Sequence, residues 1–275
     1  MQRLVNSNDH DIMNLELNKL HFAAQHWGFF QLINHGVSSS VVEKMKHETQ
    51  KFYNLPLEKK KKFERSPRDA DGFGQLFVVS DEQILDWADF FYLKTAPPHL
   101  RMSIFSKLYL SLRETIEEYT EEIKELSMKV LEMLGKALGI KEKEVKSLFE
   151  EGMQSMRMNY YPPCPQPNKV IGFYPHSDPF ALKILLQFNE TQGLQVKKDG
   201  IWIPILPLHN AFIVNIGDTF ESSRLNVILG PASSLVTTHN PPKFKTIGAT
   251  EFYRGYLNRE LVGKSYVEAM RINHQ

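Results

Sequence analysis

One long apolar stripe constrains the first half of this chain more than any other feature. Its members recur in alternating steps of four and three: Leu112, Ile116, Tyr119, Ile123, Leu126, Val130, Met133 and Ala137. This spacing places them all on one face of a helix, and Gly139 follows as a stop signal. A coiled-coil seam would have similar spacing. We favour a core helix that backs a sheet, because the stripe ends after about four heptads and contains Tyr119 and Ala137.

Two shorter helices and a strand are expected before this stripe. Residues 17–27 carry apolar side chains at helical spacing, Gly28 follows as a stop, and residues 29–33 form the pattern of a buried strand. Serines at 38–40 offer N-caps for the next helix, which should end near Pro56. The predicted buried face of this helix consists of Val42, Met45, Thr49 and Phe52.

Short strands replace the helices from Ser155 onward. They are expected at residues 156–161, 182–188, 194–197, 202–205 and 211–216. The tripeptide Lys198-Asp199-Gly200 supplies the turn of an antiparallel hairpin, and residues 252–270 return to a helical pattern. Helices first and strands second indicate an α+β class, with helices packed on a β-sandwich or roll.

Composition excludes several partners and environments. Thirty-three Lys and Arg residues against 32 Asp and Glu leave a net charge of +1, without the basic face that nucleic acid or anionic lipid would require. No apolar run approaches the roughly 18 residues of a membrane span. The first twenty residues contain Asp9, Asp11 and Glu16 and lack the apolar core of a secretory signal. Because Cys164 is the single cysteine, a reducing, cytoplasmic location is expected.

The tripeptide His176-Ser177-Asp178 is the first candidate for chemistry. On a strand, positions two apart face the same side, so both side chains could reach one divalent ion. The facial triad of two histidines and one carboxylate in non-haem Fe(II) oxygenases begins with such a pair. The spacing alone is common, and taken by itself it favours an ordinary surface pair.

Longer motifs occur before and after this pair along the chain. In chain order they are WGFFQLINHG at 27–36, LDWAD at 85–89, RMNYYPPCPQP at 157–167, NAFIVNIGD at 210–218, GPASSL at 230–235 and GKSY at 263–266. Together they resemble the plant soluble 2-oxoglutarate- and Fe(II)-dependent dioxygenases over nearly the whole chain. The branch that contains alkaloid O-demethylases and senescence-related members is the most similar.

This resemblance implies an α+β fold whose core is a double-stranded β-helix, or jelly-roll, packed against N-terminal helices. Residues 1–150 would form the helix-rich N-terminal region, residues 151–250 an incomplete jelly-roll core and residues 251–275 a C-terminal helix. The resemblance further implies that His176 and Asp178 bind Fe(II).

The resemblance also assigns the cosubstrate. Asn159 and Tyr161 match residues that contact 2-oxoglutarate in this family, although ordinary strand polarity would explain them without it. The family converts 2-oxoglutarate and O2 to succinate and CO2 while a small molecule is oxidised, with ascorbate as a possible supporting cofactor. The metal carries the redox step, and the protein contributes geometry and a dry pocket.

The family pattern breaks after residues 215–221. Relatives continue through two strands that carry the distal histidine and an Arg-x-Ser pair, whereas here residues 222–230 follow at once. This indicates an internal deletion that removes the third metal ligand and the usual carboxylate clamp. The start is also short, because residues 1–4 resemble the middle of the family's first conserved strand.

Three other residues are possible substitutes for the lost groups. His239 is a weak candidate for the third ligand, because the Pro-rich sequence around it favours an exposed loop. His209 is expected in a turn and is a weaker candidate still. Arg224, with Asn226 in place of the usual serine, is a candidate partner for the cosubstrate carboxylate.

Three functional classes follow for the chain. The first is an oxidoreductase that hydroxylates or O-demethylates a small plant specialised metabolite. The second is a catalytically silent relative without the distal His and the Arg-x-Ser motif, and the third is a non-oxidative enzyme on the same scaffold. Phe180 and Lys183 stand where relatives carry small residues and Thr, so Phe180 would narrow the substrate entrance. The strand at 211–216 would be left as an exposed, uncharged edge open to self-association.

Overall fold

A computed structural model describes residues 10–65, 71–75, 86–101, 103–149 and 152–218, with short segments at 228–229, 238, 241–242, 245, 247–248 and 270–272. Its α-helices are α2 (His10–His26), α3 (Ser39–Tyr53), α4 (Leu57–Lys60), α5 (Ser103–Ser106), α6 (Leu110–Ala137) and α7 (Glu142–Phe149). Short 3-10 helices are η1 (Lys61–Phe63), η2 (Pro98–Leu100) and η3 (Pro167–Lys169). The strands are β1 (Phe29–Leu32), β2 (Gly72–Gly74), β3 (Asp89–Ala96), β4 (Gln154–Tyr160), β5 (Leu182–Leu185), β6 (Gln195–Lys198), β7 (Ile201–Pro204), β8 (Phe212–Ile216), β9 (Ile228–Leu229) and β10 (Ile247–Gly248).

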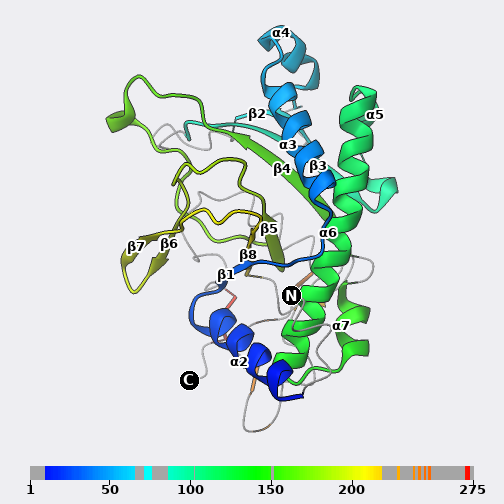
Figure 1. The fold of residues 1–275 in the computed structure, drawn as a ribbon, viewed down its shortest axis with the longest axis vertical. Coiled ribbons are helices and arrows are strands. Elements are labelled where there is room, and N and C mark those ends of the chain that lie inside the picture. Colours follow the sequence, from blue (N-terminus) through cyan, green and yellow to red (C-terminus); the bar gives the residue numbers. More distant parts are fainter. Residues whose placement is uncertain are drawn as a thin grey trace.

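The long helix α6 is the element against which the others pack. It runs down much of the molecule, with α3 beside its upper part and α2 near its lower end (Figure 1). Six of the eight residues of its predicted stripe are buried in the main core, with Leu112 and Ile116 having no exposed surface, while Met133 and Ala137 are partly buried. The helix ends at a left-handed Gly139 with φ of 72°. The prediction of a core helix is therefore confirmed.

Helix α3 also matches its prediction in extent and in buried face. Val42, Met45, Thr49 and Phe52 are all buried, and the Phe52 ring stacks on Phe91 of β3 at 4.7 Å. The predicted capping bond differs from the structure. Ser38 occupies the N-cap position but makes no capping bond, because its hydroxyl is hydrogen-bonded to the Ser40 hydroxyl.

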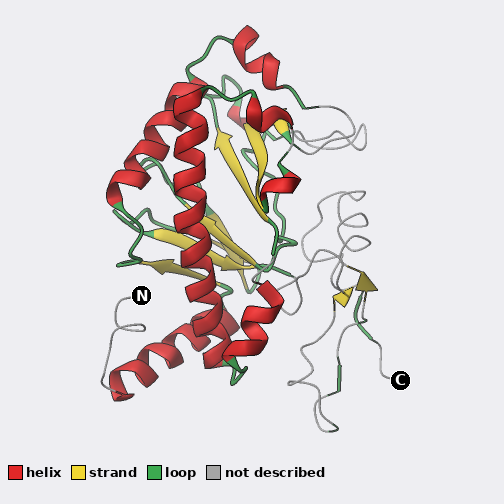
Figure 2. Cartoon of the chain, turned by 90° about the vertical axis from the view of Figure 1, so that its right-hand side faces the viewer, coloured by secondary structure: helices red, strands yellow, loops and turns green. Residues whose placement is uncertain are grey.

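Two three-stranded antiparallel sheets lie behind the helices, one in the order β1-β8-β5 and the other β2-β3-β4 (Figure 2). The β6–β7 hairpin lies at the left side of Figure 1, and Lys198 Nζ donates to the His26 carbonyl at the end of α2, at 2.6 Å. Its turn has Asp199 at φ 50° and Gly200 at φ 82°, the two positive angles of a type I′ turn, as the sequence predicts.

Strand β8 contradicts the expectation of an exposed edge at residues 211–216. It lies between β1 and β5, with Phe30 opposite Val214 on one side and Ile184 opposite Val214 on the other. Residues 212–215 are all buried. The apolar run therefore forms a central strand, and the N-terminal segment supplies the neighbour that local sequence could not reveal.

Gly217 joins β8 to the segment that follows His176. Its N–H donates to the Ala181 carbonyl at 3.1 Å, and the next N–H, of Asp218, donates to the Asp178 carbonyl at 2.7 Å. A Cβ at Gly217 would overlap the Phe180 carbonyl oxygen and would lie 2.8 Å from the Asp178 carbonyl oxygen. Only glycine fits this close approach of two backbones.

Gly217→Ala should therefore lower stability by about 1–3 kcal/mol, because the added methyl must push two backbone segments apart. Gly193→Ala is the matched control, since a Cβ there meets nothing within 4 Å. Melting curves of both variants would check this expectation. Equal melting temperatures for the two variants would contradict it.

Candidate functional site

His176 and Asp178 converge on one point of the structure. The distance from His176 Nε2 to Asp178 Oδ1 is 3.5 Å, and their side chains are 17% and 13% exposed. The tripeptide does not lie within a named strand, as the sequence argument assumed; it belongs to the irregular segment between η3 and β5. Backbone hydrogen bonds from Gly217 and Asp218, directly after β8, hold Asp178 and Ala181, and the Tyr174 carbonyl holds the His176 ring.

The imidazole of His176 has a fixed orientation. Its Nδ1 lies 2.8 Å from the Tyr174 carbonyl oxygen, which can only accept a hydrogen bond, so Nδ1 carries the proton. In the neutral ring this leaves the Nε2 lone pair directed at the Asp178 side. The Phe173 ring packs edge-on against the imidazole at 4.2 Å. This arrangement is the one that a metal-binding histidine requires.

Asp86 anchors the segment that carries the histidine. Its Oδ1 accepts from the Tyr174 N–H at 2.8 Å, while His176 is hydrogen-bonded to the carbonyl of the same Tyr174. Next to it, the Trp87 N–H donates to the Ile171 carbonyl at 2.7 Å and the Trp87 indole N–H to the Pro162 carbonyl at 2.8 Å. The LDWAD motif signalled resemblance but gave no sign of this positioning role.

The carboxylate of Asp178 is hydrogen-bonded on both oxygens. Asn215 Nδ2 donates to Oδ2 at 2.8 Å, and Lys183 Nζ lies 3.0 Å from Oδ1. Lys183 and Asn215 are directly opposite each other in the β5–β8 register. Burial opposes the charge on Asp178, but a hydrogen bond from the protonated form of the His176 ring, the Lys183 ammonium and the Asn215 amide hold the pKa of its carboxyl well below the usual range.

The geometry of this pair fits two ligands of one divalent cation. Two ligand atoms about 2.1 Å from an ion and at right angles are about 3 Å apart, close to the observed 3.5 Å. Over the described ranges, no group of three His, Cys, Asp or Glu side chains could hold a metal. His209 is an exposed turn residue, as predicted. The predictions for Arg224 and His239 lie outside the described residues.

The predicted cosubstrate residues lie at the end of β4. Asn159 pairs with Phe90 of β3, and Tyr161 follows the last strand residue; both side chains are exposed. Arg157 shares the face of Asn159 by strand alternation. Its guanidinium lies 4.3 Å from the Phe90 ring and 4.7 Å from the Phe173 ring, which itself contacts His176.

Arg157 is a further residue near the site, and its sequence context gives no sign of this position. Among the described residues, its buried Nε has no hydrogen-bond partner. Burial lowers the pKa of this guanidinium, while the nearby Tyr161 and Asp86 favour its charged form. In the sequence Arg157 stands out only as part of a motif, because its burial arises from the rings of Phe90 and Phe173 on two other segments.

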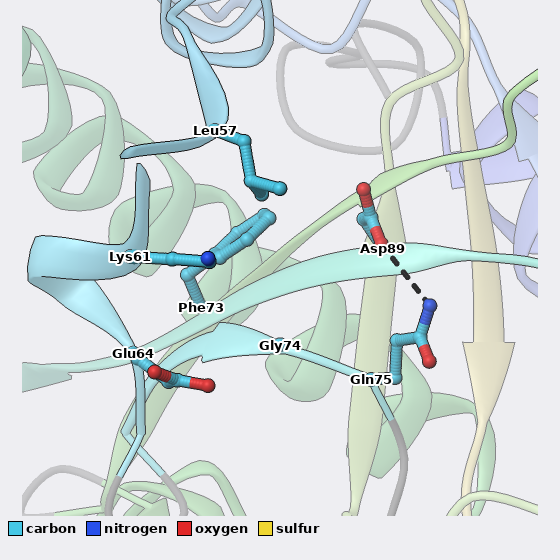
Figure 3. A pocket seen from close by; sticks show the side chains of 7 residues that line it. All are labelled: Leu57, Lys61, Glu64, Phe73, Gly74, Gln75 and Asp89. Atoms are coloured by element: carbon cyan, nitrogen blue, oxygen red, sulfur yellow. Dashed lines mark hydrogen bonds between the residues drawn. The ribbon is translucent and has the colours of Figure 1, made fainter. Parts of the chain in front are cut away.

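A separate cavity of 270 Å³ lies at the end of β2 and β3 (Figure 3). Its lining residues are Leu57, Lys61, Glu64, Phe73, Gly74, Gln75 and Asp89. Gln75 and Asp89 are joined across it by a hydrogen bond of 3.5 Å. Phe90 lies on the face of β3 that is directed, through Arg157 and Phe173, toward the His176–Asp178 pair. By strand alternation Asp89 lies on the opposite face of β3, so this cavity is distinct from that pair.

Two family models match the chain. The non-haem dioxygenase in morphine synthesis N-terminal model matches residues 1–108, and the 2OG-Fe(II) oxygenase superfamily model matches residues 152–225. The second match contains the His176–Asp178 pair. Together with the relatives below, it places the chain in the 2-oxoglutarate- and Fe(II)-dependent oxygenase family, as the sequence resemblance predicted.

Curated relatives narrow the class to plant enzymes of specialised metabolism. Oxoglutarate-dependent flavonoid 7-O-demethylase 1 of Ocimum basilicum is 47% identical over 304 residues, covering 100% of this chain and 81% of the relative. Thebaine 6-O-demethylase of Papaver somniferum is 45% identical over 95% of this chain and 81% of the relative. Protein SRG1 of Arabidopsis thaliana is 44% identical over 99% and 84%.

A solved structure confirms the predicted jelly-roll class. The crystal structure of JOX2 in complex with 2OG, Fe and JA has a TM-score of 0.88 and 32% identity, over 94% of this chain and 86% of that one. Dioxygenase for auxin oxidation from rice shares the fold at a TM-score of 0.80 and 19% identity, over 98% of both chains. Fe(II) and 2-oxoglutarate are the cofactor and cosubstrate of this family.

The alignment to the basil relative is longer than the chain itself. It extends over 304 positions for 275 residues, a difference of 29 positions of the relative that have no counterpart here. The match to the oxygenase superfamily model ends at residue 225, just after Arg224.

Within the described part of the chain, no helix is long and apolar enough to cross a membrane.

Removing the Asp86 carboxylate should weaken metal binding at the His176–Asp178 pair. Asp86→Ala frees the Tyr174 N–H, so the carbonyl that orients His176 loses its anchor, and Co(II) affinity should fall about 10- to 100-fold. Asp86→Asn keeps an acceptor oxygen and should retain most of the affinity. Titration calorimetry with Co(II) would measure both.

Asp89→Ala is the matched control for this experiment, because it removes a carboxylate from the same motif that contacts Gln75 rather than the segment with His176. Its affinity should equal that of the unaltered chain. An Asp86→Ala protein that is folded and binds Co(II) as tightly as the control would show that Asp86 does not position His176.

Proposed function

We propose that this chain is a dioxygenase that O-demethylates a small methoxylated plant metabolite. The single observation that carries the proposal is the convergence of His176 Nε2 and Asp178 Oδ1 at 3.5 Å in a chain 43–47% identical to three O-demethylases. The names of those relatives describe a flavonoid, thebaine and codeine as their substrates, and this supports a methyl ether as the substrate class here.

In this proposal His176 and Asp178 bind Fe(II), and Asn159 and Tyr161 contact 2-oxoglutarate. Bound iron and 2-oxoglutarate supply the oxidant when O2 is present. Ascorbate would keep the iron reduced. Arg224 is the proposed partner of the distal cosubstrate carboxylate, through a charge-assisted hydrogen bond.

The protein's own contribution is binding and exclusion of water. The buried Phe90 ring and the half-buried Phe173 ring both pack against the Arg157 guanidinium, and Phe173 also contacts the imidazole of His176. These rings form an apolar wall on that side of the His176–Asp178 pair. The overall reaction balances as methyl ether, 2-oxoglutarate and O2 giving alcohol, formaldehyde, succinate and CO2. One oxygen atom of O2 enters succinate, and the other leaves in the formaldehyde formed from the methyl carbon.

A catalytically silent relative is the second candidate function. The 29 positions without a counterpart support it, and we propose that they follow Glu221, where the family's distal histidine and Arg-x-Ser pair are expected. Loss of one ligand and of the carboxylate partner would each cost about tenfold or more in binding or turnover. Such a chain would keep the scaffold and a weak metal site. A non-oxidative enzyme on this scaffold is the third candidate.

The test is turnover of a panel of methoxylated flavones and alkaloids with Fe(II), 2-oxoglutarate and ascorbate. We expect formaldehyde and succinate in equal amounts, because both products come from one O2, and we expect both to vanish in His176→Ala. His209→Ala, an exposed histidine in a turn, is the control and should retain turnover.

Each other result selects a different function. Metal binding that depends on His176 without turnover of any substrate would identify the silent relative. Conversion that persists after chelation of iron would identify the non-oxidative enzyme.

We further propose a cytoplasmic location, which the single cysteine supports, and self-association through sheet edges. In the described part of the chain, the edges of the β8-centred sheet are β1 and β5 rather than β8. Unpaired backbone groups on such strands can pair with a second chain. Light scattering after size exclusion should then show dimers or larger species. A monodisperse monomer at all concentrations would contradict this expectation.

A further inference from the structure

Lys183 occupies an unusual place for a cation beside a predicted metal site. It lies on β5 with its ammonium 3.0 Å from Asp178 Oδ1, the oxygen that also faces His176 Nε2 at 3.5 Å. A divalent ion shared by His176 and Asp178 would need a lone pair of this oxygen. The lysine and the metal would thus contact the same atom.

The second oxygen of Asp178, Oδ2, is also hydrogen-bonded, so a metal could bind it instead of Oδ1 only if that contact changed. Oδ2 accepts from the Asn215 amide at 2.8 Å, and Asn215 is the cross-strand partner of Lys183. Strands β5 and β8 therefore present one positive and one neutral donor to the two oxygens. Electrostatically the ammonium already does for the carboxylate what a bound cation would do.

The lysine is also free to move, unlike the rest of the cluster. Its side chain is 38% exposed, whereas those of His176 and Asp178 are 17% and 13% exposed. A four-carbon stem at this exposure can swing the ammonium into solvent without disturbing β5. Displacement of this one side chain would leave Asp178 Oδ1 open to a metal without backbone rearrangement.

We propose that Lys183 is a built-in counter-cation that competes with the metal for Asp178 and keeps the metal-free form stable. The proposal rests on the proposed function only in taking His176 and Asp178 as the metal-binding pair. It predicts that metal occupancy is weak because of Lys183 itself, in addition to any loss of a third ligand.

The test is Co(II) titration of the full chain in three forms: unaltered, Lys183→Thr and Lys183→Arg. Lys183→Thr removes the competing charge with a residue suited to a strand, and its Co(II) affinity should rise about tenfold or more. Lys183→Arg keeps the charge and should stay near the unaltered value. Lys197→Met, which removes a lysine from the exposed face of β6, controls for net charge and should change nothing.

Thermal melting provides the opposing readout. Without metal, Lys183→Thr should melt below the unaltered chain, because Asp178 loses its counter-cation. Saturating Co(II) should reverse this order. A variant that is less stable but binds Co(II) with unchanged affinity would show that Lys183 is only a structural partner, and the proposal would be overturned.

Acylation of the lysine amine would report displacement directly. Co(II) should increase labelling of Lys183 by an amine-reactive ester, measured by peptide mass spectrometry, while labelling of Lys197 stays constant. Unchanged labelling at saturating Co(II) would overturn the competition. In His176→Ala, loss of Co(II) binding supports the metal pair independently, so failure of the Lys183 inference is distinguishable from failure of the proposed function.

Discussion

The central position of β8 is the constraint on which the candidate site depends. The strand lies between β1 and β5, and its Phe212 and Val214 side chains belong to the same buried core as the stripe of α6. From this fixed strand, Asn215 reaches the Asp178 carboxylate, and the backbone N–H groups after Ile216 bind the carbonyls of Asp178 and Ala181. The irregular segment with His176 is thereby fastened to a rigid strand, which gives two separate side chains a defined distance.

Local sequence predicted the elements whose causes are themselves local. The stripe of α6, the buried face of α3 and the Asp199-Gly200 turn each follow from neighbours a few residues apart, and the structure confirms them. The central place of β8 was missed because its partner β1 lies about 180 residues earlier in the chain. A run without charge is compatible with an aggregation-prone edge or with a strand buried on both faces, and only pairing decides between them.

The residues of the candidate site could likewise be predicted from sequence only where their causes are local. The pair His176 and Asp178 was found from its two-residue spacing and surrounding motifs, but its geometry rests on contacts that no spacing encodes. Asp86 acts 88 residues away, through the Tyr174 N–H. Lys183 was noted as a departure from the family, yet its contact with Asp178 required the register of β5 on β8.

The described core lies in the part of the chain before the family pattern breaks. Among the residues that the structure describes, every member of the main buried cluster lies between Leu20 and Val214. The bonds that orient His176 and Asp178 likewise come from residues up to Asp218. The described contacts that place the two side chains therefore come from residues that precede Glu221. Where a third ligand is lost, such a scaffold loses affinity rather than orientation, because orientation comes from packing and hydrogen bonds, whereas affinity depends on the number and charge of the ligands. The pair can thus remain in metal-binding geometry even where the third ligand is lost.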